Sequence, residues 1–134
     1  MTLFLKKYWL SILTILTVFI LCLIDSEQFP EPPVISFDKI VHVLMFAGLS
    51  GILFFDNTSY LKFPISKRRI FLYIFLFPVA IGGLIEIMQE YLTATRSGDW
   101  FDFLFDIVGG FIGWGIALLI NQRYLLKNKK LFNS

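Results

Sequence analysis

The chain has 134 residues, of which 57% are hydrophobic, 18% aromatic and 16% charged. Soluble domains contain about 25% charged residues, so this composition excludes an ordinary soluble enzyme and indicates a membrane protein. The net charge of +2 is small and the basic residues are dispersed, which excludes a nucleic-acid-binding patch. The single cysteine, Cys22, excludes an internal disulfide and a cysteine-based zinc site, so we expect a small core or lipid-facing residue there.

The first apolar run covers residues 8–24 and follows two lysines. A secretory signal peptide begins in the same way, but no small-residue cleavage pattern follows this run. We therefore predict a retained transmembrane helix. Residues 25–37 are acidic and rich in proline, so we expect a loop there, either a plain connector or a lid over the region beneath it.

The second apolar run covers residues 38–55 and begins with an Asp-Lys pair. Asp38 and His42 are four positions apart and therefore share one face of the predicted helix. Asp38 could instead cap the helix or interact with its dipole, but neither role accounts for His42 one turn deeper. Ala47 and Gly51 repeat the same spacing and predict close packing against a neighbouring helix.

The third apolar run, residues 70–92, is the longest. Pro78 lies in its middle and two glycines follow, which predicts a kink or a local loosening of the helix. Near the end of the run, Glu86, Gln89 and Glu90 recur at intervals of three and four residues. This spacing places the three side chains on one helix face.

The fourth apolar run covers residues 101–120 and begins with two aspartates four positions apart, Asp102 and Asp106. Gly109 and Gly113 continue at the same spacing. Small residues repeated in this way allow another helix backbone to approach closely in a membrane. We therefore expect the aspartates and the glycines to lie along one packed face.

Lysine and arginine predict the orientation of the helices. Ten of the twelve lie at the N-terminus, in the polar loop 56–69 or in the C-terminal tail. The other two, Lys39 and Arg96, lie in the loops on the opposite side. The positive-inside rule therefore places both termini in the cytoplasm. We predict a single domain, residues 1–134, that is an all-α membrane protein with four transmembrane helices in an antiparallel bundle.

This topology places the unusual polar residues level with one another on the outer side of the membrane. Charged groups near the middle of a membrane helix cost about 2.5–3.5 kcal/mol each, so they persist where they pair, line a cavity or perform chemistry. We therefore predict a polar pocket that opens outward. Its predicted binding residues are Asp38, Lys39, His42, Glu86, Gln89, Arg96, Asp102 and Asp106.

These residues allow both a structural and a catalytic role. In the structural interpretation, Arg96 pairs with Asp99 or Asp102, and Lys39 pairs with Glu90. In the catalytic interpretation, crowded carboxyl groups divide into a protonated acid and an ionised base, and a histidine acts as a general base. The catalytic candidates are His42, Glu86, Asp102 and Asp106. No nucleophile motif is evident, so the sequence leaves open whether the protein is an enzyme.

Two further roles are less favoured by the sequence. One histidine with several carboxylates suits a divalent ion, but no metal-binding spacing is present, so we predict no metal and no cofactor. A proton path through the membrane would need polar groups on both sides. The cytoplasmic halves of the predicted helices are apolar, which argues against such a path.

The same residues carry a resemblance to a known family. The chain resembles the VanZ-like family of small bacterial membrane proteins over roughly residues 36–115. The pattern of that family corresponds here to an Asp-Lys-x-x-His, a Glu-x-x-Gln, an Arg and a polar pair that leads into Gly-x-x-x-Gly. These are Asp38, Lys39, His42, Glu86, Gln89, Arg96, Asp102, Asp106, Gly109 and Gly113. Asp106 is a departure, because the family more often has Asn at this position.

The resemblance implies a protein of the cytoplasmic membrane that acts in the cell envelope, since the founding member of the family is linked to low-level resistance to the glycopeptide teicoplanin. We therefore expect a pocket that binds or senses an envelope component, with a link to glycopeptide resistance. The alternative is a small intramembrane enzyme that performs acid–base chemistry on a lipid-linked or surface substrate. The expected partners are the lipid bilayer and an envelope lipid or glycopeptide, with no nucleic acid.

Overall fold

A computed structural model of the chain describes residues 2–24, 35–60, 64–93 and 98–132. Within these ranges every regular element is helical, which confirms the predicted all-α class. The elements are α1 (Thr2–Lys7), α2 (Trp9–Leu23), α3 (Ile35–Tyr60), α4 (Lys67–Ile70), the π-helical η2 (Phe71–Leu76), α5 (Phe77–Leu92) and α6 (Trp100–Phe132). The last helix extends well past the predicted end at residue 120.

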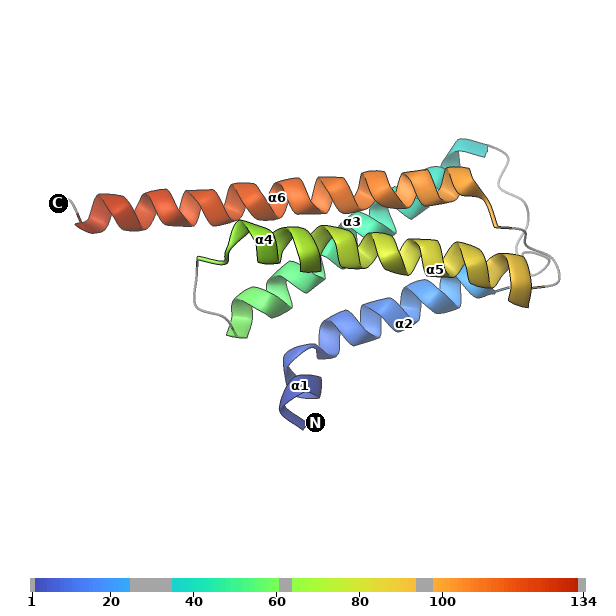
Figure 1. The fold of residues 1–134 in the computed structure, drawn as a ribbon, viewed down its shortest axis with the longest axis horizontal. Coiled ribbons are helices and arrows are strands. Elements are labelled where there is room, and N and C mark those ends of the chain that lie inside the picture. The colour runs from blue at the N-terminus through green and yellow to red at the C-terminus, as the bar shows by residue number, and fades with distance from the viewer. Residues whose placement is uncertain (1, 25–34, 61–63, 94–97, 133–134) are drawn as a thin grey trace.

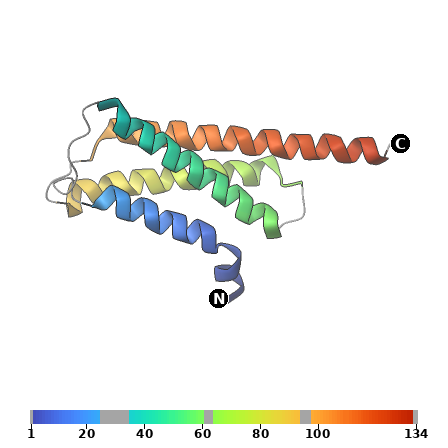
Figure 2. The same cartoon turned by 180° about the vertical axis from the view of Figure 1, so that it is seen from behind.

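The long helices run side by side in one bundle (Figure 1). The end of α2, the start of α3, the end of α5 and the start of α6 all lie at the same end of this bundle, and the view from behind agrees (Figure 2). The most extensive helix contact is between α3 and α6. Sequence segments that the prediction placed on one side of the membrane are therefore neighbours in space.

Three helical stretches are long and apolar enough to cross a membrane: Asp38–Ser59, Lys67–Leu92 and Trp100–Asn128. The predicted first span corresponds to α2, which has 15 residues. A transmembrane helix needs about 20 residues, so α2 alone is shorter than a full span. The structure therefore supports a multi-pass membrane protein with three candidate spans, and a fourth span remains a prediction.

Close packing of α3 on α6 depends on two glycines of α6, as the small-residue spacing predicts. A Cβ atom on Gly109 would collide with the backbone oxygen of Val43, and one on Gly113 would collide with the side chain of Ser50. On α3 the packed position after Ala47 is Ser50, because a Cβ atom on Gly51 would meet nothing within 4 Å. The expected contribution of Gly51 to this packing is therefore wrong.

The irregularity predicted at Pro78 is a π-helical turn just before it. The backbone N–H of Phe77 donates to the carbonyl of Leu72, five residues earlier. Proline has no N–H and its ring crowds the preceding turn, so a wider turn accommodates it without ending the helix. The stretch from α4 through η2 to α5 thus continues as one span, and Pro78 itself is buried.

Polar hydrogen bonds link the helices at the opposite end of the bundle. Asp56 at the end of α3 accepts hydrogen bonds from the backbone N–H and the hydroxyl of Ser11, at 2.9 and 2.7 Å. The amide of Asn121 on α6 bonds to both the N–H and the carbonyl of Ile65, at 3.0 and 2.9 Å. These contacts fasten α2 to α3 and the segment before α4 to α6. They show how this fold uses buried polar groups for structure.

Candidate functional site

The closest contact of the site joins α3 to α6. The Nδ1 atom of His42 lies 2.8 Å from Oδ1 of Asp106. Both residues are buried, with 3% and 0% of their surface exposed. Asp106 precedes Gly109 by one helical turn, so the glycine packing that brings the two backbones together also brings these side chains within hydrogen-bonding distance.

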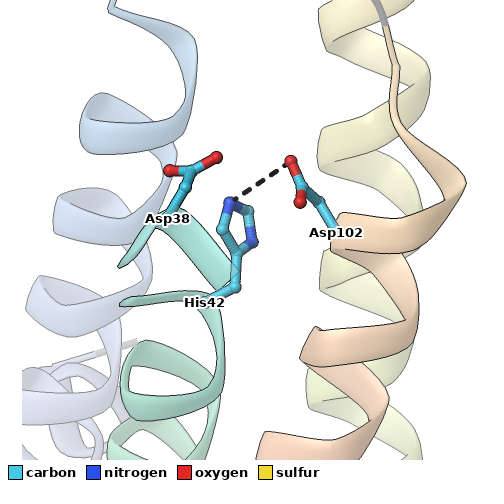
Figure 3. A group of neighbouring side chains, drawn as sticks. All are labelled: Asp38, His42 and Asp102. Carbon is cyan, nitrogen blue, oxygen red and sulfur yellow. Dashed lines mark ion pairs between the residues drawn. The ribbon is translucent and has the colours of Figure 1, made fainter. Parts of the chain in front are cut away.

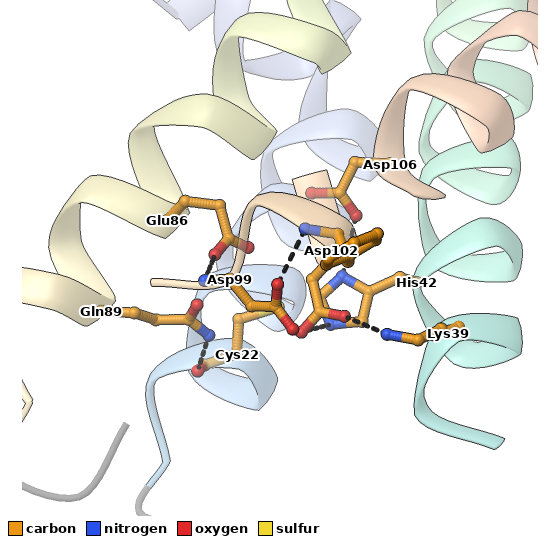
Figure 4. Close-up of polar contacts among 9 residues, drawn as sticks. Cys22, Lys39, His42, Glu86, Gln89, Asp99, Asp102 and Asp106 are labelled. Atoms are coloured by element: carbon orange, nitrogen blue, oxygen red, sulfur yellow. Dashed lines mark hydrogen bonds and ion pairs between the residues drawn. The ribbon is translucent and has the colours of Figure 1, made fainter. Parts of the chain in front are cut away.

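The other ring nitrogen of His42 faces a second aspartate of α6. Its Nε2 atom lies 3.8 Å from Oδ2 of Asp102 (Figure 3). The Nζ atom of Lys39 lies 3.7 Å from the other oxygen of Asp102, on the more exposed side (Figure 4). Asp38 also lies close, since it, His42 and Asp102 each offer one atom within 4.8 Å of the others. Because α3 begins at Ile35, Asp38 lies in the first turn and acts on the helix dipole rather than as the cap.

Glu86 brings α5 to the site. One of its carboxylate oxygens, Oε2, accepts a hydrogen bond from the backbone N–H of Asp99 at 2.7 Å (Figure 4). Glu86, His42 and Asp106 each offer one atom within 4.8 Å of the others, and all three residues are buried. Three helices therefore meet at one point, as the sequence predicts. We use the name polar cluster for the residues that gather here: Asp38, Lys39, His42, Glu86, Asp102 and Asp106.

Gly82 leaves space for α6 to approach α5 at the polar cluster, and the sequence did not lead us to expect this role. A Cβ atom at Gly82 would lie 2.7 Å from Oδ2 of Asp106. Gly82 comes one turn before Glu86 on the same helix. At Gly82, α5 therefore has no side chain between its backbone and the carboxylate of Asp106, and the carboxylate of Glu86 lies one turn further along. The sequence did contain a signal, because Gly82 precedes Glu86 by four residues. We interpreted Gly82 only as a place where the helix loosens.

The polar cluster retains unused hydrogen-bonding capacity. Four buried side-chain atoms among the described residues have no hydrogen-bond partner. Two of them belong to this site: Oε1 of Glu86 and Oδ2 of Asp106. Buried acceptors usually have a partner, and one without a partner costs free energy. At the opposite end of the bundle, by comparison, Oδ2 of Asp56 accepts two hydrogen bonds from Ser11, and the oxygen and the nitrogen of the Asn121 amide are both bonded to the backbone of Ile65.

Gln89 has a structural contact instead of a place in the polar cluster. Its Nε2 atom donates to the backbone carbonyl of Cys22 at 2.8 Å, which ties α5 to the last turn of α2 (Figure 4). Cys22 is itself buried, so of the two expected positions, core or lipid-facing, it has the core position. The predicted pairing of Lys39 with Glu90 is also replaced. Lys39 lies beside Asp102, and Glu90 accepts a hydrogen bond from the backbone N–H of Gly98 at 3.0 Å.

Arg96 lies outside the described residues, so its predicted place in the pocket and its pairing with Asp99 or Asp102 stay predictions. The predicted loop 25–37 lies outside them except for its last three residues, which belong to α3.

A cavity of about 380 Å³ adjoins the polar cluster. It lies between the last turns of α5 and the start of α6, and Glu86 links it to the buried histidine. Its lining residues are Glu86, Ile87, Glu90, Tyr91, Gly98 and Trp100. Of the polar cluster, Glu86 alone is among the lining residues of this cavity, so the cavity contacts the cluster through Glu86, and a pocket lined by all the predicted residues stays a prediction.

Comparisons with known proteins agree with the resemblance seen in the sequence. The family model described as VanZ/LLP1 matches residues 2–121. An uncharacterized protein of Schizosaccharomyces pombe is 35% identical over 114 residues, which cover 82% of this chain and 64% of that relative. The match therefore spans slightly less than two thirds of the relative's length. No solved structure matches this chain.

Proposed function

The chain belongs to the VanZ/LLP1 family, and we propose that its polar cluster binds the head group of a lipid or lipid-linked component of the cell envelope. In this proposal the protein resides in the cytoplasmic membrane and the cluster faces the outer side. The three candidate spans and the family match establish the membrane class on which the proposal depends. The ligand and the orientation are the parts to be tested.

The observation that carries the proposal is the unused capacity of Glu86 and Asp106. Both side chains are buried in helices with the composition of membrane spans, yet each keeps one oxygen without a partner. In a purely structural network we would expect partners for these oxygens, as Oδ2 of Asp56 has at the opposite end. A bound polar group would complete them. The 380 Å³ cavity beside Glu86 offers space for such a group.

The orientation is supported by the distribution of charge. Ten of the twelve basic residues lie at the N-terminus, in the polar loop 56–69 or in the C-terminal tail. The described helices of these segments, α1, α4 and the end of α6, lie away from the polar cluster, toward the other end of the bundle (Figure 1). The positive-inside rule then assigns the cluster to the outer side. From this side the protein would meet lipid-linked molecules of the envelope. We therefore propose that binding reduces susceptibility to glycopeptides such as teicoplanin.

Acid–base catalysis is the second candidate function, and the His42–Asp106 pair favours it. A carboxylate bonded to one imidazole nitrogen orients the ring and fixes its tautomer, while the other nitrogen is left to exchange a proton. In this chain the other nitrogen, Nε2, faces Asp102 at 3.8 Å. The proposed substrate class is the same, a lipid-linked or surface molecule. An enzyme would change that molecule chemically, whereas a binding protein would return it unaltered.

The experiment compares wild type with His42→Gln and Glu86→Gln. Each protein is expressed in a bacterium sensitive to teicoplanin and purified in a mild detergent, and the lipids that remain bound are identified by native mass spectrometry. Asp56→Asn is the matched control, because it changes a buried carboxyl at the opposite end of the bundle. Any loss of bound lipid from Asp56→Asn measures the effect of destabilisation alone.

The expected result is a bound lipid on wild type and Asp56→Asn that is at least tenfold depleted from His42→Gln and Glu86→Gln at equal membrane levels. Teicoplanin susceptibility should follow lipid occupancy. Equal lipid occupancy in all four proteins would overturn the binding proposal. A chemically altered lipid that accumulates with wild type but not with His42→Gln would favour the enzyme.

A further inference from the structure

We propose that His42, Glu86 and Asp106 form a binding site for one divalent transition-metal ion, such as Zn²⁺ or Mn²⁺. This inference rests on the proposed function, because the ion would occupy the inner part of the same polar cluster and face the bound head group. It differs from our prediction from the sequence, which found no metal-binding spacing. The three residues come from three separate helices, so no short motif could reveal them.

The geometry suits three ligands to one ion. One atom from each residue lies within 4.8 Å of the other two. Bonds of about 2.0–2.2 Å in a tetrahedral site place ligand atoms about 3.3–3.5 Å apart. The side chains therefore need only small rotations to close on an ion. His42 and Asp106, now 2.8 Å apart across a hydrogen bond, would separate slightly as the ion replaces the shared proton.

The unpartnered oxygens are the independent observation for an ion. Oε1 of Glu86 and Oδ2 of Asp106 are buried and have no hydrogen-bond partner. Two ionised carboxylates in a low-dielectric interior repel each other and lose their hydration. A divalent cation between them and a neutral imidazole removes the net charge of the group. A ligand in this position would therefore resolve both the missing contacts and the excess negative charge.

The second group of potential ligands, Asp38, His42 and Asp102, is a weaker candidate. Asp38 is exposed to solvent, and Asp102 already has Lys39 at 3.7 Å. The cation of that lysine neutralises the carboxylate and would repel a metal ion. In the group of His42, Glu86 and Asp106, all three members are buried. Lys39 forms its ion pair with Asp102, which is not a member of this group.

Asp102 has a role in the same arrangement as an orienting partner. If Nδ1 of His42 binds the ion, Nε2 carries the ring proton and points toward Asp102, 3.8 Å away. A carboxylate behind a metal-bound histidine fixes the ring and raises its basicity. Lys39 in turn holds Asp102 from the other side. The chain thus supplies both the ligands and the groups that hold the histidine in place.

The donor set selects the class of ion. One imidazole nitrogen with carboxylate oxygens suits Zn²⁺ or Mn²⁺. Ca²⁺ prefers six to eight oxygen ligands, and Mg²⁺ keeps several waters that a buried site would have to hold. With three protein ligands, a tetrahedral ion would keep one open position. A phosphate or hydroxyl of a head group would suit that position.

The test uses the purified full-length protein in detergent, stripped with a chelator and dialysed. Zn²⁺ and Mn²⁺ are titrated separately, and the number of metal ions bound per chain is measured by inductively coupled plasma mass spectrometry. Wild type and Asp56→Asn are expected to bind one ion per chain. Glu86→Gln and Asp106→Asn should lower the affinity at least 100-fold. Asp102→Asn, which changes only the orienting group, should lower it about 10- to 100-fold.

Absence of stoichiometric binding by wild type to either ion would overturn the metal site. Equal affinity in wild type, Glu86→Gln and Asp106→Asn would also overturn it. The wild-type titration carries the test even where one variant fails to fold. Lipid occupancy of the same wild-type protein separates the two proposals: bound lipid with no metal bound in the titration retains the proposed function and rejects the ion, whereas metal bound in the titration with no bound lipid retains the ion and rejects the proposed function.

Discussion

The imidazole of His42 and the carboxylate of Asp106 meet 2.8 Å apart across the α3–α6 interface, although 64 positions separate them in the chain. The contact is fully buried and lies between two helices that also pack through glycines. The glycine packing and the His42–Asp106 hydrogen bond are therefore coupled at this interface. A substitution that disturbs the packing should also weaken the hydrogen bond, and the reverse should hold as well.

A double-mutant cycle should detect this pair. We predict that His42→Ala or Asp106→Ala alone lowers the free energy of unfolding by about 3 kcal/mol, because each leaves a buried polar partner behind. The double variant should lose clearly less than the sum of the two losses, because neither partner then remains. Unfolding in detergent measures each value. Simple additivity would contradict a direct interaction between the two side chains.

Gly82 should tolerate no side chain. We predict that Gly82→Ala lowers thermal stability and displaces Asp106, because the added Cβ atom would lie 2.7 Å from Oδ2 of that residue. Gly83→Ala is the matched control, because its Cβ atom would be no closer than 3.4 Å to the ring of Phe103. Melting temperatures in detergent compare the two. Equal losses in both variants would mean that the approach of Asp106 to α5 is not the cause.

The α3–α6 interface offers a similar comparison within one helix. Gly109→Ala should lower the free energy of unfolding by about 1–3 kcal/mol, the usual range for overpacking a close contact, since its Cβ atom would collide with the backbone of Val43. Gly115→Ala, in the same helix, would meet nothing within 4 Å and should leave stability unchanged or slightly raised. Denaturant unfolding of both variants gives the difference.

Gln89 should prove to be structural. We predict that Gln89→Leu lowers the free energy of unfolding by about 1–3 kcal/mol, because the carbonyl of Cys22 loses its donor. The lipid occupancy of the folded fraction should remain that of wild type. A selective loss of lipid with unchanged stability would restore Gln89 to the binding residues that the sequence predicts.

The orientation can be measured by labelling single cysteines. Glu90 lies at the end of α5 near the polar cluster, and Arg123 lies on α6 toward the other end; both are exposed. We predict that Glu90→Cys reacts with a membrane-impermeant maleimide in intact cells and that Arg123→Cys reacts only after lysis. The buried native Cys22 should give little background. The opposite pattern would reverse the orientation.

The helices were predictable because their apolar runs are long and their polar residues recur at helical spacing. The spacing of Asp102 and Asp106 assigned both aspartates to one face of their helix, and the spacing near the end of α5 grouped Glu86 and Gln89, which are buried, with Glu90, which is exposed. The short reach of α2 was not predictable from hydrophobicity, because the run 8–24 has the composition of a span but forms a helix of only 15 residues.

Partner choice was the part that the sequence could not supply. Periodicity indicates which face of a helix a residue occupies, but not how far neighbouring helices rotate or slide. Lys39 pairs with Asp102 rather than with Glu90 because of how the helices are rotated. The contact of Gln89 with Cys22 depends on the same rotation. The same limit explains why the proposed metal site, with ligands from three helices, would have no signature in the sequence.

The π-helical turn at Phe71–Leu76 has a consequence for Glu86. Successive residues of an α-helix turn by about 100°, and a π turn accommodates one residue more than an α turn. Removing one residue within this stretch would restore a regular helix and leave the residues after it on the same faces. Removing one residue from the regular helix between this stretch and Glu86 would instead turn Glu86 by about 100° away from His42. The direction of a buried carboxylate is thus set by the winding of its helix several turns away, and the wide turn is the place where the loss of a residue would be absorbed.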